Sequence, residues 1–191
     1  MEKPILFVNA CVRSESRTLR LAEKLLLAMN RPFEELRLGG IAFPAVDEDF
    51  LRMRDRLVSS REFQSPVFDL ARQFAMAETI VIAAPYWDLS FPAALKQYFE
   101  QINVVGITFR YTDTGIPVGL CRANRLYYVT TAGGCIVPDA FGFGYVKALA
   151  QDFYGIRDVR KVQAVGLDLD GADAEAIMKA AEADLKDVIQ S

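Results

Sequence analysis

The stretch "VIAAPYWDLSFPAALKQYFEQI", residues 81–102, contains the unit from which the fold is built. It begins as a short apolar strand and ends as a helix that places Leu95, Phe99 and Ile102 on one face. A buried strand that leads directly into an amphipathic helix is typical of proteins with a parallel sheet. Between the two elements lies a turn that holds Trp87, the only tryptophan of the chain.

The same alternation extends along the whole sequence. Strands are predicted at residues 5–8, 33–38, 80–84, 126–131 and 162–167, the second being more polar and suited to an edge. Helices are predicted at residues 19–29, 92–102, 145–153 and 174–188. Residues 47–77 are helical in composition but broken near Pro66, and residues 105–121 form a Gly- and Thr-containing excursion. This pattern predicts an α/β fold with a parallel sheet, in one domain over residues 1–191.

The composition limits the classes of function. With 191 residues, 52% hydrophobic and 25% charged, the chain can bury a sizeable core. A net charge of -3 gives no reason to expect nucleic acid as a partner, and no apolar run is long enough for a membrane span. The chain enters a strand directly, so we expect no signal peptide. Three unpatterned cysteines favour a reducing, cytoplasmic location.

The sequence contains no histidine. Catalysis by a Ser-His-Asp or Cys-His arrangement is therefore impossible, as is a His-ligated metal. The cysteines lack the spacing of a zinc site, so no metal is expected. If the protein is an enzyme, we expect a cofactor to supply its chemistry.

Ligands of parallel sheets bind outside the carboxyl ends of the strands. The loop after the first strand, residues 9–18, holds hydroxyl and guanidinium groups directly before a helix, on Arg13, Ser14, Ser16, Arg17 and Thr18. Such a helix start can bind phosphate, although the loop lacks the G-x-G-x-x-G and P-loop patterns. A simple helix cap explains the same residues equally well.

The loops after the third and fourth predicted strands carry further ligand-binding signals. Pro85 precedes Tyr86 and Trp87, whose rings can flank a flat heterocycle or pack under a neighbouring loop. "TAGG", residues 131–134, allows close approach of backbone to a ligand or forms a tight turn. A phosphate, a flat ring and a close backbone approach together describe FMN.

The chain resembles the flavodoxin-fold NAD(P)H:quinone oxidoreductases, and among them the FMN-dependent NADH-azoreductases. The resemblance is carried by "RSESRTLRLAEKL", "GITFRYTDTG", "TTAGG" and residues 81–102. It implies a flavodoxin-like three-layer sandwich with a five-stranded parallel sheet in the order 2-1-3-4-5. It also implies FMN as cofactor, NADH or NADPH as donor, and ping-pong hydride transfer to a small-molecule acceptor such as a quinone, azo or nitro compound.

The resemblance also assigns roles to individual residues. Ser14, Glu15 and Ser16 match the phosphate-binding stretch; Tyr86, Trp87, Asp88 and Leu89 match the loop around the flavin ring; Thr131, Ala132, Gly133 and Gly134 match the loop along its other edge. Phe109 and Tyr111 match the wall of the substrate pocket, often across a homodimer interface, and Tyr111 is a candidate proton donor. Phe91, Tyr98 and the helix after Asp47 are candidate interface residues.

Two positions depart from the family pattern. Asp88 stands where relatives have Asn, and a carboxylate near the flavin would disfavour the anionic reduced ring. Many relatives have a His soon after the Gly-Gly pair, where this chain has residues 135–138, "CIVP". Two other functions therefore stay open: a flavodoxin-type electron carrier, and a non-catalytic flavodoxin-like regulatory or ancillary subunit.

Overall fold

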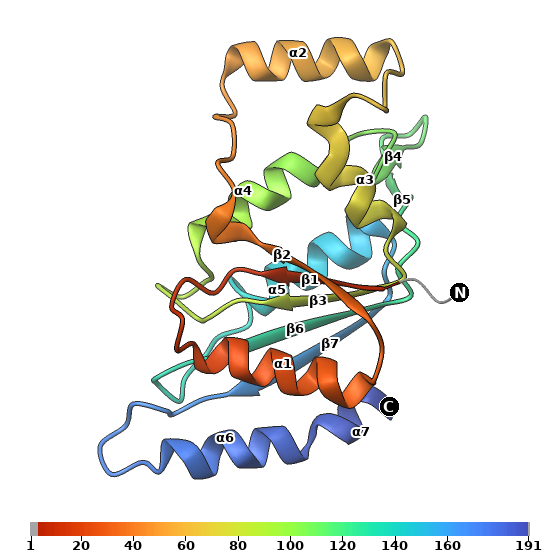
Figure 1. Ribbon diagram of the computed structural model, residues 1–191. Coiled ribbons are helices and arrows are strands. Elements are labelled where there is room, and N and C mark those ends of the chain that lie inside the picture. Colours follow the sequence, from red (N-terminus) through yellow and green to blue (C-terminus); the bar gives the residue numbers. More distant parts are fainter. Residues whose placement is uncertain (1–3, 191) are drawn as a thin grey trace.

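Five parallel strands form one sheet in the order β2-β1-β3-β6-β7 (Figure 1). The structure is a computed structural model that describes residues 4–190. The strands are β1 (Ile5–Asn9), β2 (Phe33–Arg37), β3 (Thr79–Ala83), β6 (Arg125–Thr131) and β7 (Asp158–Ala164). The predicted fold class and strand order are confirmed, and β2 lies at an edge as its polar composition indicates.

Helices cover both faces of the sheet. One face carries α1 (Arg17–Met29), α6 (Ala174–Ala183) and α7 (Leu185–Gln190), and the other carries α3 (Asp69–Met76), α4 (Ala93–Ile102) and α5 (Phe143–Ala148) (Figure 1). Side chains alternate between the faces: Ile5 and Phe7 of β1 pack with α1, whereas Leu6 and Val8 belong to the opposite core. This two-sided burial explains why the central strands are continuous apolar runs.

The last strand differs from its prediction, because β7 begins at Asp158 and ends at Ala164 instead of covering 162–167. Its first residues are polar, but their charges are paired within the chain: the Arg160 Nε atom donates to Asp158 Oδ1 at 2.8 Å. Lys161 pairs with Asp139 at 2.7 Å. Ion pairing at a sheet edge therefore supports a strand that the apolar pattern alone does not reveal.

The helical segments also refine the prediction. Residues 47–77 form two helices, α2 (Glu48–Ser59) and α3, and a 3₁₀ turn at Pro66–Phe68 leads into α3. The predicted final helix is divided in two at Asp184. A second 3₁₀ turn covers Leu38–Gly40, and α5 continues as a wider π turn at Leu149–Tyr154. Every residue of α2 is at least partly exposed, and this helix stands clear of the sheet (Figure 1).

The excursion at 105–121 contains an antiparallel hairpin of β4 (Phe109–Tyr111) and β5 (Pro117–Gly119). A Cβ added at Gly119 would lie 2.1 Å from the backbone carbon of Tyr154, so only glycine allows β5 to pass this closely. Tyr154 comes shortly before β7 begins, and the hairpin accordingly lies at the edge of the sheet where the parallel strands begin (Figure 1). Among residues 4–190, no helix combines the length and apolar character needed to cross a bilayer.

Candidate functional site

A cavity of about 380 Å³ opens at the edge where the parallel strands end. We call it the strand-end cavity; it is lined by Val12, Arg13, Glu15, Ser16, Arg17, Thr18, Pro85, Tyr86, Trp87, Thr131, Ala132, Gly133, Leu167 and Asp168. Most residues predicted to bind the cofactor are in this lining, and all three predicted loops contribute. Ser14, Asp88, Leu89 and Gly134 were predicted with them but lie outside the lining. The carboxylate of Asp88 is thus beside the cavity and not part of its wall.

The start of α1 forms one end of the cavity. Ser16 caps this helix, because its Oγ atom accepts a hydrogen bond from the Leu19 N–H at 3.2 Å. The hydroxyls of Thr18 and Thr131 are 2.6 Å apart and buried, which ties the helix start to the end of β6. The cap and the anion site are therefore compatible: the same residues that begin the helix also present its positive end to the cavity.

The loop before α1 is held by Asn9, a fully buried polar residue at the end of β1. Its Oδ1 atom accepts from the Cys11 N–H at 2.9 Å, and its Nδ2 atom donates to Glu35 at 2.7 Å. Burial raises the pKa of the neighbouring Cys11 thiol to about 11, so this group stays protonated at neutral pH. Cys11 therefore acts as an apolar support for the loop.

The loop at residues 85–90, which we call the aromatic loop, makes a tight turn between Trp87 and Ser90. The backbones of these two residues exchange hydrogen bonds of 3.1 and 2.8 Å. The two residues at its tip, Asp88 and Leu89, have φ angles of 51° and 68°. A left-handed conformation costs about 1–2 kcal/mol for a residue other than glycine. The turn holds Trp87 at the cavity, with 39% of the residue exposed. This position favours the ring-flanking role of Trp87 over simple packing.

Tyr86 has features of both predicted roles, the flanking of a flat ring and packing against a neighbouring loop. It lines the cavity, and its N–H donates to the Thr131 carbonyl at 3.0 Å. Its hydroxyl, however, is buried and has no hydrogen-bond partner among residues 4–190. A Cβ added at Gly142 would lie 4.0 Å from the Tyr86 ring, which places this ring against the 139–142 segment. Tyr86 thus supports the loop as well as the cavity wall.

The two glycines after β6 serve different purposes. A Cβ added at Gly133 would lie 2.4 Å from Oδ2 of Asp168, so a side chain there would displace that carboxylate. A Cβ added at Gly134 would meet open space. The loop after β7 runs alongside this segment, and the N–H groups of Leu167 and Asp168 donate to Ala132 and Gly133 at 3.2 and 3.1 Å. Gly133 thus leaves room for the Asp168 side chain, whereas Gly134 has no such neighbour.

Sequence reasoning missed Val12, Leu167 and Asp168. The rule that places ligands at strand ends applies to the last strand too, but the predicted strand ran to residue 167 and hid this loop. Asp168 pairs with Arg17, whose Nη1 atom lies 2.7 Å from Asp168 Oδ1. No set of three His, Cys, Asp or Glu side chains within residues 4–190 is arranged to hold a metal ion.

Comparison with known proteins agrees with this arrangement of sheet and loops. A family model described as having a flavodoxin-like fold matches residues 3–189. The chain belongs to this family.

Other members of the flavodoxin-like family include named enzymes. The chain is 32% identical to an FMN-dependent NADH:quinone oxidoreductase of Clostridium beijerinckii, over 93% of each chain. It is 34% identical to a protein of the same name from Coprothermobacter proteolyticus, over 90% of each chain. The crystal structure of an azoreductase from Bacillus anthracis superposes with a TM-score of 0.85 at 26% identity, covering 98% of each chain.

Two predicted site residues of this family member do not reach the strand-end cavity within one chain. Phe109 and Tyr111 lie on the hairpin at the opposite edge of the sheet. At about 3.3 Å per residue, a seven-residue strand such as β6 separates the two edges by about 20 Å. Phe109 is buried against Phe153, with ring centroids 4.8 Å apart, whereas Tyr111 is 49% exposed. Within one chain the two residues therefore lie apart from the cavity, and their predicted place in a pocket wall across a homodimer interface stays a prediction.

The predicted interface residues need one correction. Tyr98 is fully buried in the core of its own chain and cannot form a surface. Phe91 is half-buried, and its ring packs against Phe99 and Tyr145 at centroid distances of 6.0 and 5.7 Å. Of the three predicted interface features, α2 is the one that is freely accessible.

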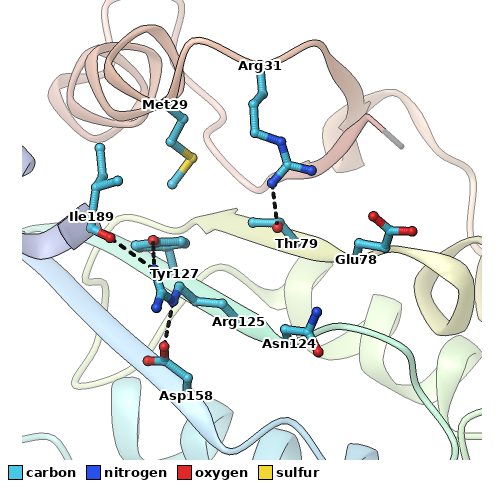
Figure 2. Close-up of a pocket in the computed structure, with 9 residues that line it drawn as sticks. All are labelled: Met29, Arg31, Glu78, Thr79, Asn124, Arg125, Tyr127, Asp158 and Ile189. Carbon is cyan, nitrogen blue, oxygen red and sulfur yellow. Dashed lines mark hydrogen bonds and ion pairs between the residues drawn. The ribbon is translucent and has the colours of Figure 1, made fainter. Parts of the chain in front are cut away.

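A second cavity, of about 330 Å³, lies at the edge where the strands begin (Figure 2). We call it the strand-start cavity; it is lined by Met29, Arg31, Glu78, Thr79, Asn124, Arg125, Tyr127, Asp158 and Ile189. The Arg125 guanidinium donates to Asp158, to the Ile189 carbonyl at 3.0 Å and to the Tyr127 hydroxyl at 3.1 Å (Figure 2). These contacts join β6, β7 and α7, so this cavity is a structural junction.

Proposed function

We propose that the chain binds FMN in the strand-end cavity and uses it to transfer hydride from NADH or NADPH to quinones or related electron-poor aromatics, including azo and nitro compounds. One observation carries the proposal: a helix start, an exposed tryptophan and the Gly133 segment at the end of β6 meet in one cavity. The names of the relatives, FMN-dependent NADH:quinone oxidoreductase and azoreductase, support it.

The residues present fit this cofactor. The phosphate would lie at the start of α1, near the hydroxyls of Ser16 and Thr18 and the guanidinium of Arg13. The flat ring would lie between the aromatic loop with Trp87 and the backbone at Gly133. Ser14 and Gly134 lie outside the cavity lining, so the fit of the cofactor does not depend on them.

Bound FMN supplies the hydride-transfer chemistry, accepting hydride from the nicotinamide and delivering it to the acceptor. The residues of the chain would bind the cofactor and orient it. Donor and acceptor would use the opening of the cavity in turn, as ping-pong turnover requires. The absence of histidine means that water, or the Tyr111 hydroxyl of a second copy of the chain, would supply the proton for a quinone acceptor.

We further propose a homodimer. In one chain the hairpin with Phe109 and Tyr111 is remote from the cavity, so a second copy would have to bring these side chains to the site. The exposed apolar residues Trp87 and Leu89 beside the cavity, and the accessible α2, support this arrangement. A single domain over residues 1–191 is consistent with the extent of the family match, and the free state of all three cysteines supports a cytoplasmic location.

An absorbance spectrum from about 300 to 550 nm tests the function, before and after anaerobic addition of NADH or NADPH. The proposal predicts flavin bands that bleach on addition of nicotinamide and return on addition of a quinone. A flavin that binds without bleaching would instead indicate an electron carrier. Failure to bind FMN, even in excess, would refute the proposal and leave the regulatory subunit.

A further inference from the structure

We propose that Asp168 limits the affinity of the strand-end cavity for FMN, because its carboxylate competes with the cofactor phosphate for Arg17. The inference rests on the proposed function, since it concerns how that same cavity recognises the phosphate. It assigns a specificity-determining role to a residue of the loop after β7, a loop that neither the sequence patterns nor the predicted cofactor contacts include.

The charges in the cavity motivate the inference. Two arginines, Arg13 and Arg17, line it together with two carboxylates, Glu15 and Asp168. Their formal charges cancel, so the side chains give the cavity no net charge that would attract a phosphate of charge close to -2. Within residues 4–190, Arg13 forms no ion pair, whereas Arg17 is paired with Asp168. The helix start and Arg13 would then attract the phosphate, and Arg17 would add to this attraction only when it is released from its carboxylate.

Arg17 is the arginine that can be released. It is the first residue of α1, where a phosphate would lie, and its Nη1 atom lies 2.7 Å from Asp168 Oδ1. The Arg17 and Asp168 side chains are 45% and 67% exposed, so their pair is a weak surface ion pair. A phosphate can form two parallel hydrogen bonds with a guanidinium and can therefore replace the carboxylate.

The position of Asp168 is built into the backbone. Its N–H donates to the Gly133 carbonyl at 3.1 Å, and its carboxylate occupies the space that a side chain at Gly133 would fill. The loop backbone thus places Asp168 at the cavity wall, where its carboxylate pairs with Arg17. Phosphate binding would free it from Arg17 without moving the loop.

The same ion pair could serve only to attach α1 to the C-terminal part of the chain. That attachment, however, is already provided by Arg20, which donates to Glu175 at 2.6 and 2.7 Å and to Glu182 at 2.9 Å. The Arg17–Asp168 pair adds little to this link. Its location in the cavity lining is better explained by an effect on the ligand.

The test compares FMN with riboflavin, which has the same ring and lacks the phosphate. The full-length apoprotein is titrated with each flavin, and the dissociation constant is obtained from quenching of flavin fluorescence. We expect Asp168→Asn to raise FMN affinity about fivefold, the order of a surface ion pair, and to leave riboflavin affinity unchanged. The gain should decrease at high salt.

Further variants separate competition from general electrostatics. Glu15→Gln removes the same charge from the cavity, but Glu15 forms no ion pair within residues 4–190, so its effect on FMN should be smaller. Asp170→Asn, in the same loop and outside the lining, should change neither flavin's affinity. Arg17→Gln should abolish the gain from Asp168→Asn in a double-mutant cycle.

Several outcomes would overturn the inference. Unchanged or weaker FMN binding by Asp168→Asn would do so, as would an equal change for riboflavin or a gain that persists without Arg17. These results leave the proposed function intact, because the wild-type protein still binds flavin. A wild-type protein that binds neither flavin would refute both proposals.

Discussion

The strand-end and strand-start cavities have similar volumes, about 380 and about 330 Å³, and arginines line both. They differ in what those arginines contact. At the strand-start cavity, Arg125 is engaged by three groups that belong to three different elements. At the strand-end cavity, Arg17 has an exposed carboxylate partner next to a helix start and a glycine. Neither cavity volume nor the presence of arginine therefore distinguishes a binding site from a structural junction. What distinguishes them is whether the arginine is fully hydrogen-bonded within the chain or has one exposed partner that a ligand can replace.

The largest difference between the two cavities is expected when each is filled with a larger side chain and the affinity for FMN is measured. Gly133→Leu should lower FMN affinity about a hundredfold, close to 2.8 kcal/mol, because its side chain would enter the space of Asp168 and the ligand. The matched change Asn124→Leu fills the strand-start cavity and should leave FMN affinity unchanged. Flavin titration of both variants measures this. Equal losses would remove the distinction between the cavities.

A second comparison replaces one arginine of each cavity by glutamine. Arg125→Gln should lower the free energy of unfolding by about 2 kcal/mol, since it removes charge-assisted hydrogen bonds to Asp158 and the Ile189 carbonyl. FMN affinity should not change. Arg17→Gln should change stability by less than about 0.5 kcal/mol and weaken FMN binding about threefold. Urea unfolding and flavin titration provide the two readouts, and the opposite pattern would contradict our assignment.

The pH dependence of stability should also belong to the strand-start side. Hydrogen bonds from Arg160 and then Arg125 hold the pKa of Asp158 below its ordinary value of 3.8. Because the folded-state pKa is the lower one, this stabilisation is complete above that value and is lost as the pH falls through the folded-state pKa. We therefore expect the Tm advantage of the wild type over Asp158→Asn to be full at pH 6 and to shrink towards pH 3. An advantage that is constant across this range would contradict the pairing.

The smallest expected effect concerns the exposed Cys135, whose modification should leave stability nearly unchanged. Burial raises the pKa of Cys11 to about 11 and that of Cys121 to about 12, so both stay as protonated thiols at pH 8. Cys135, beside the strand-end cavity, is exposed. A thiol reagent at pH 8 should therefore label Cys135 in the native protein and the other two only after unfolding. Mass spectrometry of the labelled peptides checks this, with Cys135→Ser as the control.

The sequence predicts those parts of the molecule that depend on apolar burial. The central strands β1, β3 and β6 are buried on both faces, so each contains an apolar run, at residues 5–8, 80–83 and 126–129. The edge strand β7 is different. Asp158 and Arg160 lie on the same side of the strand and pair with each other, so its first residues are charged and show no apolar pattern. The resulting error in its end concealed Asp168. The hairpin at 109–119 depends on a backbone contact at Gly119 that no local pattern announces.

The turn at 87–90 has a consequence for directed evolution. Two residues other than glycine hold left-handed backbone angles at its tip, and one of them, Leu89, is 57% exposed. Replacement of Leu89 by glycine would relieve about 1 kcal/mol of that conformational cost. A screen that rewards heat resistance alone would therefore favour glycine or asparagine at position 89, whereas a screen for flavin retention would act on Trp87, the residue of this turn that lines the cavity. Sequences recovered from the two screens should diverge first at this turn.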